Sequence, residues 1–429
     1  MSELILSIES DGIIREHHVV TFNSLNGSSV KTIFFQNNDK KPCVQVRRDV
    51  ENATLSMSYY IGTDWLIENK QAIYVAPKVN NLGQQVDYLG MLHASLSHVD
   101  ALSHAKELYE IKLNQPFIEV DQQMDLITPL IMLQFLHTLK HIVIKGLKKS
   151  YYKVEHNLAS KIKGRVLTSK NIKKNLVQNK PINTYCQHDE FGLDSIENRV
   201  LNHTLSFVRR YFAKYPAYNK LTKSLIDFCT PAFENVADKV DLKALKQTKY
   251  NSFYKEYKQA LDLSKIIFKR FGYHISEVES TNSSRVSVPP FWIDMSKLFE
   301  LYVLSLLKDK YGNKIVFQAK GNYGEPDFLL LEDNTPLIMD AKYKPLYQNH
   351  DYNSDDIRQI SGYARDHKIL NRLGFATQAE RENNVVGCVI IYTDQSGKKE
   401  LPETLTETPI EQFTKFYKVP IAMPVLRTS

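Results

Sequence analysis

The spacing of hydrophobic and polar residues divides the chain into three parts. Residues 1 to about 80 contain short alternating or β-branched runs, such as 30–35, 44–46 and 73–75, with turn residues such as Asn26 and Gly27 between them. This pattern predicts the strands of a small barrel or sandwich. Because no catalytic pattern occurs there, we expect a module that binds a partner.

From about residue 100 to 280 the hydrophobic period becomes helical. Apolar residues lie three and four positions apart over 103–113, 126–144, 195–212 and 250–271, which predicts four amphipathic helices. Residues 194–197 have the pattern of a capping box that opens the third helix. A Ser-, Thr- and Pro-containing stretch, 280–290, predicts a linker.

After this linker the pattern alternates between helix and strand. Residues 291–310 are apolar nearly all round, which predicts a buried helix. Strands are predicted at 314–319, 328–331, 336–342 and 385–392. We therefore expect a multidomain α+β protein, with a β-rich module at 1–100, a helical region at 101–285 and an α/β domain at 286–429.

Composition excludes several classes of protein. The chain is 43% hydrophobic and 24% charged, with four widely separated cysteines, so it is neither disordered, nor a disulfide scaffold, nor a CxxC metal protein. Polar residues interrupt the most apolar stretch, 127–146, which favours a buried helix over a membrane span. The N-terminus has no signal-peptide pattern, and we expect a cytoplasmic protein.

The positive charge of the chain is concentrated in one segment. The net charge is +7, but residues 140–180 hold eleven lysines, Arg165 and a single acid, Glu155. This segment carries about +11, so the rest of the chain is slightly acidic. Such a surface suits a DNA backbone or an acidic partner, although a solvated helix face is the alternative. The candidate DNA contacts are Lys148, Lys149, Lys163, Arg165, Lys173 and Lys174.

Candidate catalytic residues gather in the last third of the chain. Asp340 and Lys342 share one face of a predicted strand, and Asp327 begins its predicted hairpin partner. Glu300 shares a stripe with Leu304 and Leu307 on the preceding helix, so its carboxylate is expected to be buried and paired or metal-bound. Three carboxylates at one sheet edge would bind Mg²⁺, with Mn²⁺ as the alternative, and would support phosphodiester hydrolysis.

This order of residues resembles the PD-(D/E)xK nuclease superfamily, whose domain is restriction-endonuclease-like. The pattern consists of a buried-helix Glu, a Gly-rich turn, Pro-Asp, a hairpin and an apolar strand ending in Asp-Ala-Lys. Members often continue with a helix that carries Gln and Tyr, and here Gln359 and Tyr363 lie one turn apart. The resemblance implies a C-terminal nuclease domain of this fold.

The motifs are similar in detail to McrC, the nuclease subunit of the McrBC modification-dependent restriction system. They are Gly-Glu-Pro-Asp-Phe at 324–328, Asp-Ala-Lys-Tyr-Lys at 340–344 and the helix 356–363, preceded by Lys-Gly-Arg at 163–165 and Glu-Asn-Arg-Val-Leu at 197–201. The resemblance implies Asp327 and Asp340 as metal-binding acids and Lys342 as the catalytic lysine. It places Glu300, Gln359 and Tyr363 as supporting residues.

The resemblance also implies partners. They are an AAA+ GTPase ring like McrB, whose hydrolysis the chain would stimulate, and double-stranded, methylated DNA, with self-association through the nuclease domain. The chain has no phosphate-binding Gly-x4-Gly-Lys-Ser/Thr loop of its own, which agrees with a separate motor. Two other interpretations stay open: a non-catalytic activator of the motor, or a stand-alone nuclease of the resolvase or transposase kind.

Overall fold

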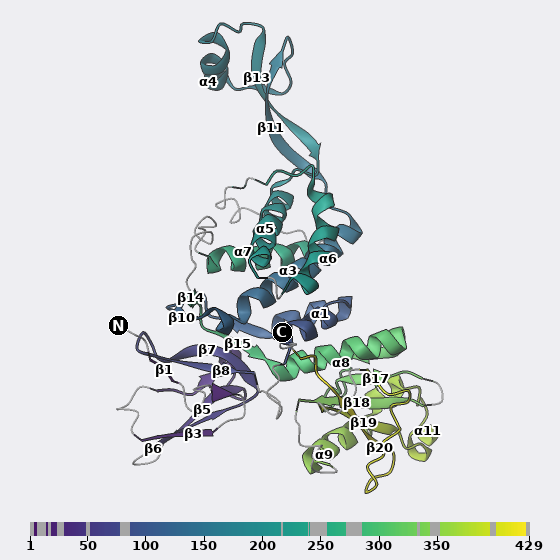
Figure 1. Ribbon diagram of the computed structural model, residues 1–429. Coiled ribbons are helices and arrows are strands. Elements are labelled where there is room, and N and C mark those ends of the chain that lie inside the picture. The colour runs from purple at the N-terminus through teal and green to yellow at the C-terminus, as the bar shows by residue number, and fades with distance from the viewer. Residues whose placement is uncertain are drawn as a thin grey trace. The chain divides into compact units, whose positions relative to one another are not determined.

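The chain folds into a mixed α+β structure with several sheets, as its pattern predicts (Figure 1). We describe it from a computed structural model. The described residues are 4–6, 14–15, 19–23, 30–48, 52–77, 86–215, 218–238, 240, 255–271, 285–332, 335–343, 352–394 and 400–425. They form two compact units, residues 1–130 with 282–429 and residues 131–281. The three-part division stays a prediction.

The first unit begins with two sheets, in which β4, β5 and β8 overlap the predicted strands at 30–35, 44–46 and 73–75. One sheet has the order β1-β8-β7-β15-β9, with β2 also paired to β8, and the other has the order β3-β6-β5-β4. Buried aromatic side chains, among them Phe35, Tyr60 and Trp292, join the two sheets in one core. The strands are β1 (Leu4–Leu6), β2 (Ile14–Arg15), β3 (Val19–Asn23), β4 (Ile33–Phe34), β5 (Pro42–Arg48), β6 (Asn52–Met57), β7 (Tyr60–Ile67), β8 (Gln71–Ala76), β9 (Tyr109–Ile111) and β15 (Phe291–Asp294).

Strand β15 corrects the predicted start of the buried helix. Phe291–Asp294 pairs with β7 on one side and β9 on the other, and the helix α8 (Met295–Tyr311) starts only after it. Asp294 ends the strand and caps the helix, since its side chain accepts a hydrogen bond from the Lys297 amide at 2.9 Å. The predicted linker is also partly wrong, because β14 (Arg285–Val288) pairs with β10 (Ile118–Asp121).

The helix predicted at 103–113 is wrong as well. Helix α2 (Val99–His104) ends at His104, and after a short 3₁₀ turn the chain enters β9. Helices α1 (Tyr88–Ser95) and α2 pack against α8. An ion pair between Lys308 and Asp100, 2.7 Å long, ties α2 to α8.

The second unit contains three of the predicted amphipathic helices. These are α3 (Ile127–Lys145, which begins in the first unit), α5 (Ile196–Ala213) and α7 (Lys255–Arg270), whose predicted start at 250–254 lies outside the described residues. A further helix, α6 (Asn219–Cys229), was not predicted. Helix α5 begins one residue after the predicted cap: the Ser195 hydroxyl accepts from the Asn198 amide, while Asp194 pairs with Arg199 instead of capping. By length and composition alone, α3 could cross a membrane, but 78% of its apolar window is buried, as predicted for a core helix.

Most of the basic segment forms a β-hairpin, within a region that the sequence pattern assigned as helical. Strands β11 (Ser150–Ala159) and β13 (Asn183–Gly192) pair antiparallel over ten residues, and β12 (Arg165–Val166) adds to β13. A short helix, α4 (Thr168–Asn171), continues into a π-turn (Ile172–Leu176) at the tip. Within its unit, this hairpin projects from the helices as an arm (Figure 1). Gly164, at φ +71°, lets β12 approach β13, because a Cβ there would lie 2.4 Å from the Gln187 carbonyl oxygen.

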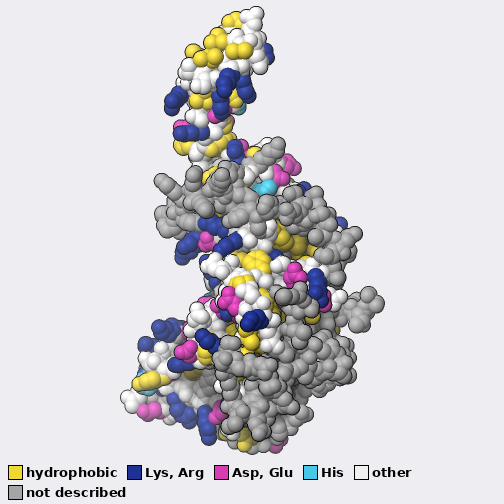
Figure 2. Space-filling view, turned by 90° about the vertical axis from the view of Figure 1, so that its left-hand side faces the viewer, with side chains coloured by type: hydrophobic (Ala, Val, Ile, Leu, Met, Phe, Trp, Pro, Cys, Tyr) yellow, Lys and Arg dark blue, Asp and Glu magenta, His cyan; other side chains and the backbone are white. Residues whose placement is uncertain are grey.

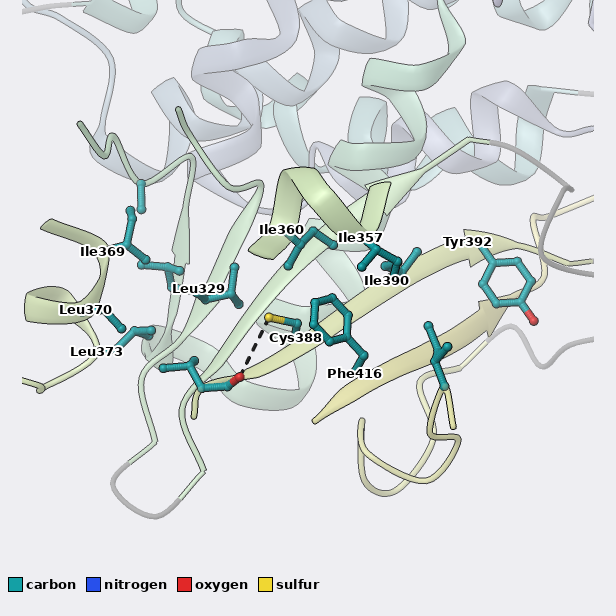
Figure 3. Packing of buried hydrophobic residues seen from close by; sticks show 14 residues of the cluster. Leu329, Ile357, Ile360, Ile369, Leu370, Leu373, Cys388, Ile390, Tyr392 and Phe416 are labelled. Atoms are coloured by element: carbon teal, nitrogen blue, oxygen red, sulfur yellow. Dashed lines mark hydrogen bonds between the residues drawn. The ribbon is translucent and has the colours of Figure 1, made fainter. Parts of the chain in front are cut away.

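A five-stranded sheet occupies the C-terminal part of the first unit. Its order is β16-β17-β18-β19-β20; the first three strands are antiparallel and the last three parallel. Cys388, Ile390, Leu329 and Phe416 on this sheet pack with Ile357, Ile360 and the α10 residues to form its core (Figure 3). The elements are β16 (Ile315–Phe317), β17 (Phe328–Leu330), β18 (Leu337–Lys342), α9 (Ser354–Tyr363), α10 (His367–Arg372), α11 (Gln378–Asn383), β19 (Gly387–Thr393) and β20 (Phe416–Ile421).

Candidate active site

The predicted hairpin brings Asp327 beside the end of β18. Phe328 pairs with Met339, so Asp327, one residue before β17, lies next to the carboxyl-terminal half of β18. Its Oδ2 accepts a hydrogen bond from the Ala341 amide at 2.7 Å. This bond fixes the Asp327 carboxylate between Asp340 and Lys342 along the strand.

Asp340 and Lys342 face helix α9. Ile338, on the same face of β18, packs with Ile357 and Ile360 of that helix. Asp340 is 2% exposed and forms a short ion pair with the Lys342 ammonium. The apolar residues of β18 and α9 therefore hold a buried charged pair at the sheet edge.

Lys342 connects the acids to the predicted Gln and Tyr. Its Nζ donates to Gln359 Oε1 at 2.9 Å and lies 3.7 Å from Asp356 Oδ1. Gln359 Nε2 donates in turn to the Tyr363 hydroxyl at 2.9 Å. Asp327, Asp340, Lys342, Gln359 and Tyr363 thus gather at one edge of the sheet, and their catalytic roles stay predictions.

Burial and mutual repulsion make the acids costly to ionise. Burial, and then the charges of Asp340 and Glu300, raise the pKa of Asp327 well above its usual range. Burial also raises the pKa of Asp340, against the opposing effect of Lys342. Burial alone would lower the pKa of Lys342, but the neighbouring carboxylates outweigh it and the net direction is upward. A site with this surplus of carboxylates favours a cation.

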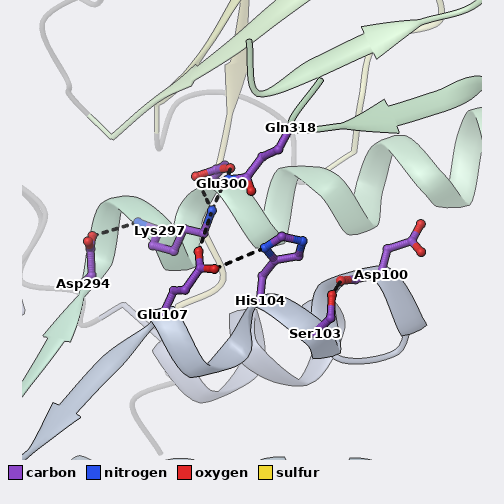
Figure 4. Close-up of polar contacts among 8 residues, drawn as sticks. All are labelled: Asp100, Ser103, His104, Glu107, Asp294, Lys297, Glu300 and Gln318. Atoms are coloured by element: carbon purple, nitrogen blue, oxygen red, sulfur yellow. Dashed lines mark hydrogen bonds and ion pairs between the residues drawn. The ribbon is translucent and has the colours of Figure 1, made fainter. Parts of the chain in front are cut away.

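Glu300 lies on α8, with its carboxylate already paired (Figure 4). Lys297 Nζ, one turn earlier, is 3.1 Å from both of its oxygens, and Gln318 Nε2 donates to Oε1 at 2.9 Å. Burial raises the pKa of Glu300, Lys297 lowers it, and the charge of Asp340 contributes to the rise. The charge of Asp340 therefore acts on Glu300, while the side chains that contact Glu300 directly are Lys297 and Gln318. Sequence reasoning missed both, although Lys297 stands at the i−3 position typical of a helical ion pair.

Asp366 is a second residue that sequence reasoning missed. Its carboxylate accepts from the backbone amides of Asn322, at 2.5 Å, and Tyr323, at 3.2 Å, and it also caps α10 through the Lys368 amide at 2.8 Å. It therefore holds the Gly-rich turn that precedes Asp327. A Cβ on Gly324 in this turn would lie 2.4 Å from Tyr363 Cε1, so the turn touches the Tyr363 ring directly.

The six predicted DNA contacts fall in two environments of the second unit. Lys148 is part of the helical packing, since its Nζ lies 3.2 Å from Glu197 and only 19% of its side chain is exposed. The other five are exposed, on or next to the arm: Lys149, Lys163, Arg165, Lys173 and Lys174. Figure 2 shows Lys and Arg side chains beside hydrophobic ones near the end of the arm. Whether they contact DNA or a partner stays a prediction.

Comparison with known proteins places this chain in a family. A family model described as the McrBC 5-methylcytosine restriction system component matches residues 56–372, while no curated protein matches.

Two solved assemblies from Thermococcus gammatolerans are similar to the chain. One is a half-complex of a tetradecameric assembly of McrB AAA+ hexamers with bound McrC, at 17% identity over 88% of this chain and 80% of that chain, with a TM-score of 0.37. The other is the McrBC complex, at 16% identity over 69% and 86%, with a TM-score of 0.31. Because the family model covers most of its length, the chain belongs to the family of McrBC 5-methylcytosine restriction system components.

Proposed function

We propose that the chain is the McrC-type nuclease subunit of such a system, a Mg²⁺-dependent endonuclease with a PD-(D/E)xK domain. The observation that carries the proposal is the group Asp327, Asp340 and Lys342 on adjacent strands, with Gln359 of α9 bonded to the lysine. Methylated double-stranded DNA would be the substrate, and an AAA+ GTPase ring the activating partner.

The donor set fits a magnesium ion. Asp327 and Asp340 supply oxygen ligands, and burial, together with repulsion from neighbouring carboxylates, raises the pKa of both acids, so that a bound cation would be favoured there. Magnesium would supply activation of water and neutralisation of phosphate charge there. Glu300 is held by Lys297 and Gln318, so it is better suited to influencing the charge of the neighbouring acids than to binding the metal directly.

Lys342 acts as a fixed positive charge. Its pKa is raised above the ordinary value, so it is protonated at neutral pH and favours stabilising charge on a phosphate over removing a proton from water. Gln359 accepts one of its hydrogens and is itself oriented by Tyr363. Gln359 and Tyr363 are therefore positioning residues for Lys342.

The exposed side chains of the arm are suited to contact with a partner protein as well as with phosphate. Four apolar side chains between 59% and 76% exposed lie among its lysines: Ile162, Leu176, Val177 and Ile182. Apolar surface of this kind gains nothing from a sugar-phosphate backbone, whereas a protein partner can bury it. This observation supports the activator role beside the nuclease role.

The test is cleavage of methylated DNA with Mg²⁺, GTP and the cognate AAA+ protein. Asp340→Ala and Lys342→Ala should abolish cleavage, while Asp355→Ala, a change of an 87% exposed residue on α9, should leave it intact. GTPase stimulation should persist in both inactive variants. Truncation at residue 286 is a poor alternative, since it would remove β15 from the middle of the N-terminal sheet. Undiminished cutting by Asp340→Ala would overturn the nuclease proposal.

A further inference from the structure

Two histidines and a glutamate gather on one face of the arm. His156 of β11 and His188 and Glu190 of β13 each offer one ligand atom, and these atoms lie within 4.8 Å of one another. In the hairpin register Val154 stands opposite His188, so His156 is its diagonal neighbour on the same face. The two imidazole centroids are 5.4 Å apart. The strand pairing thus fixes the cluster.

His188 is buried and incompletely satisfied. Its side chain is 5% exposed, and Nε2 lies 2.9 Å from Glu190 Oε1. Its Nδ1 is buried and has no hydrogen-bond partner among the described residues. Because a buried polar atom without a partner costs free energy, the described side chains and backbone groups alone do not satisfy this ring.

Glu190 contacts its neighbours through one carboxylate oxygen, Oε1, which lies 2.9 Å from His188 Nε2. The Lys163 ammonium is 3.7 Å from Oε1, the same oxygen that meets His188, so Oε2 is left for another ligand. The Lys163 side chain is 60% exposed, so its ammonium group can move into solvent and leave Glu190 accessible.

We propose that His156, His188 and Glu190 form a binding site for a late first-row divalent metal, of which Zn²⁺ is the representative. Two imidazole nitrogens and one carboxylate oxygen form a donor set that this class prefers and that Mg²⁺ does not. Three protein ligands leave a position for water, and the exposed His156 lets an ion enter from solvent. The bound ion would join β11 to β13 below the basic tip and stiffen the arm. This site is independent of the proposed nuclease centre.

The experiment is titration of the full-length chain with Co²⁺, whose visible absorption reports nitrogen-containing tetrahedral sites. The wild-type chain should develop this absorption with one equivalent of Co²⁺, and Zn²⁺ should remove it by displacement. His156→Ala and Glu190→Gln, both away from the buried core, should weaken binding by roughly tenfold or more. Lys163→Ala should bind more tightly than wild type, because it removes the competing cation.

Two controls separate the cluster from other sites. His367→Ala changes an exposed histidine outside the cluster and should leave the titration unchanged. Asp340→Ala removes the acidic centre and should also retain the absorption. The proposal is overturned if the wild type gives no absorption, if His156→Ala titrates like the wild type, or if Asp340→Ala abolishes the signal.

Discussion

The Asp366 carboxylate offers a direct test of how the candidate site is positioned. It is 8% exposed and accepts hydrogen bonds from the backbone amides of Asn322, Tyr323 and Lys368. Asp366→Ala removes all of them, and with them the anchor of the turn that leads into Asp327. We expect the first unit to lose stability and cleavage to fall.

The expected loss follows from the lost bonds. Removal of the helix cap costs about 1 kcal/mol. Each hydrogen bond to a charged acceptor contributes about 1.5–3 kcal/mol, and water replaces part of this in an exposed turn. We therefore expect Asp366→Ala to lower the free energy of unfolding by about 3 kcal/mol, which lowers the thermal unfolding midpoint by about 6–12 °C. Asp366→Asn keeps one acceptor oxygen and an equally good cap, so it should lose about 1 kcal/mol.

The effect should depend on pH with a defined sign. Burial tends to raise the pKa of Asp366, but the amide hydrogen bonds outweigh it and the net direction is downward. When the pKa of a carboxyl group is lower in the folded than in the unfolded protein, its contribution to stability is complete at pH values above the unfolded pKa, about 3.9. This contribution is lost as the pH falls through the folded pKa. The difference between wild type and Asp366→Ala should therefore be constant from pH 8 to 5 and shrink below about pH 4.

Thermal unfolding at several pH values, with hydrogen exchange of the Asn322 and Tyr323 amides, measures these effects. Asp355→Ala serves as the exposed control, since its partner Arg358 is also exposed. The reasoning is refuted if Asp366→Ala melts within about 1 °C of wild type at pH 7, or if its deficit grows as the pH is lowered.

Two further substitutions test contacts in the two units. Gly324→Ala would place a Cβ 2.4 Å from the Tyr363 ring, so we expect about 1–3 kcal/mol of strain and reduced cleavage, whereas the control Gly362→Ala meets nothing within 4 Å. Equal cleavage rates for these two variants would contradict the contact. Asn198→Ala should cost about 3 kcal/mol, because Asn198 is fully buried, donates to two carbonyl oxygens and accepts from the Tyr257 hydroxyl at 2.8 Å. The urea midpoint measures this loss, and an unchanged midpoint would refute the role of the network.

The local pattern of residues along the sequence was sufficient to predict the arrangement of much of the candidate site. The hairpin between Asp327 and Asp340, the shared face of Asp340 and Lys342, and the one-turn spacing of Gln359 and Tyr363 all follow from strand and helix periods. These contacts lie within short stretches of chain, so periodicity alone places the side chains.

Pairing across long stretches of chain escaped prediction. Residues 291–293 are apolar and lead into a helix without a break, so their period alone does not reveal a strand that pairs with β7, more than two hundred residues earlier. The basic segment was missed for a different reason, since it was assigned to the helical region and read for its charge, while Tyr152, Val154 and His156 alternate as a strand requires. Asp366 was missed because most of its partners are backbone amides, which leave no trace in side-chain patterns.

The position of β15 dictates the order in which the protein can fold during synthesis. Strand β9 pairs with β15 alone among the described strands, so β7 and β9 cannot join one sheet until residue 294 has been made. The ribosome completes residues 131–281 before that point, and this unit can fold while the sheet still has an open edge. Because Asp294 is also the cap of α8, the last residue of this strand stabilises the first turn of the helix that carries Glu300. A nascent chain that stalls before β15 would thus expose a strand edge and have no candidate catalytic centre.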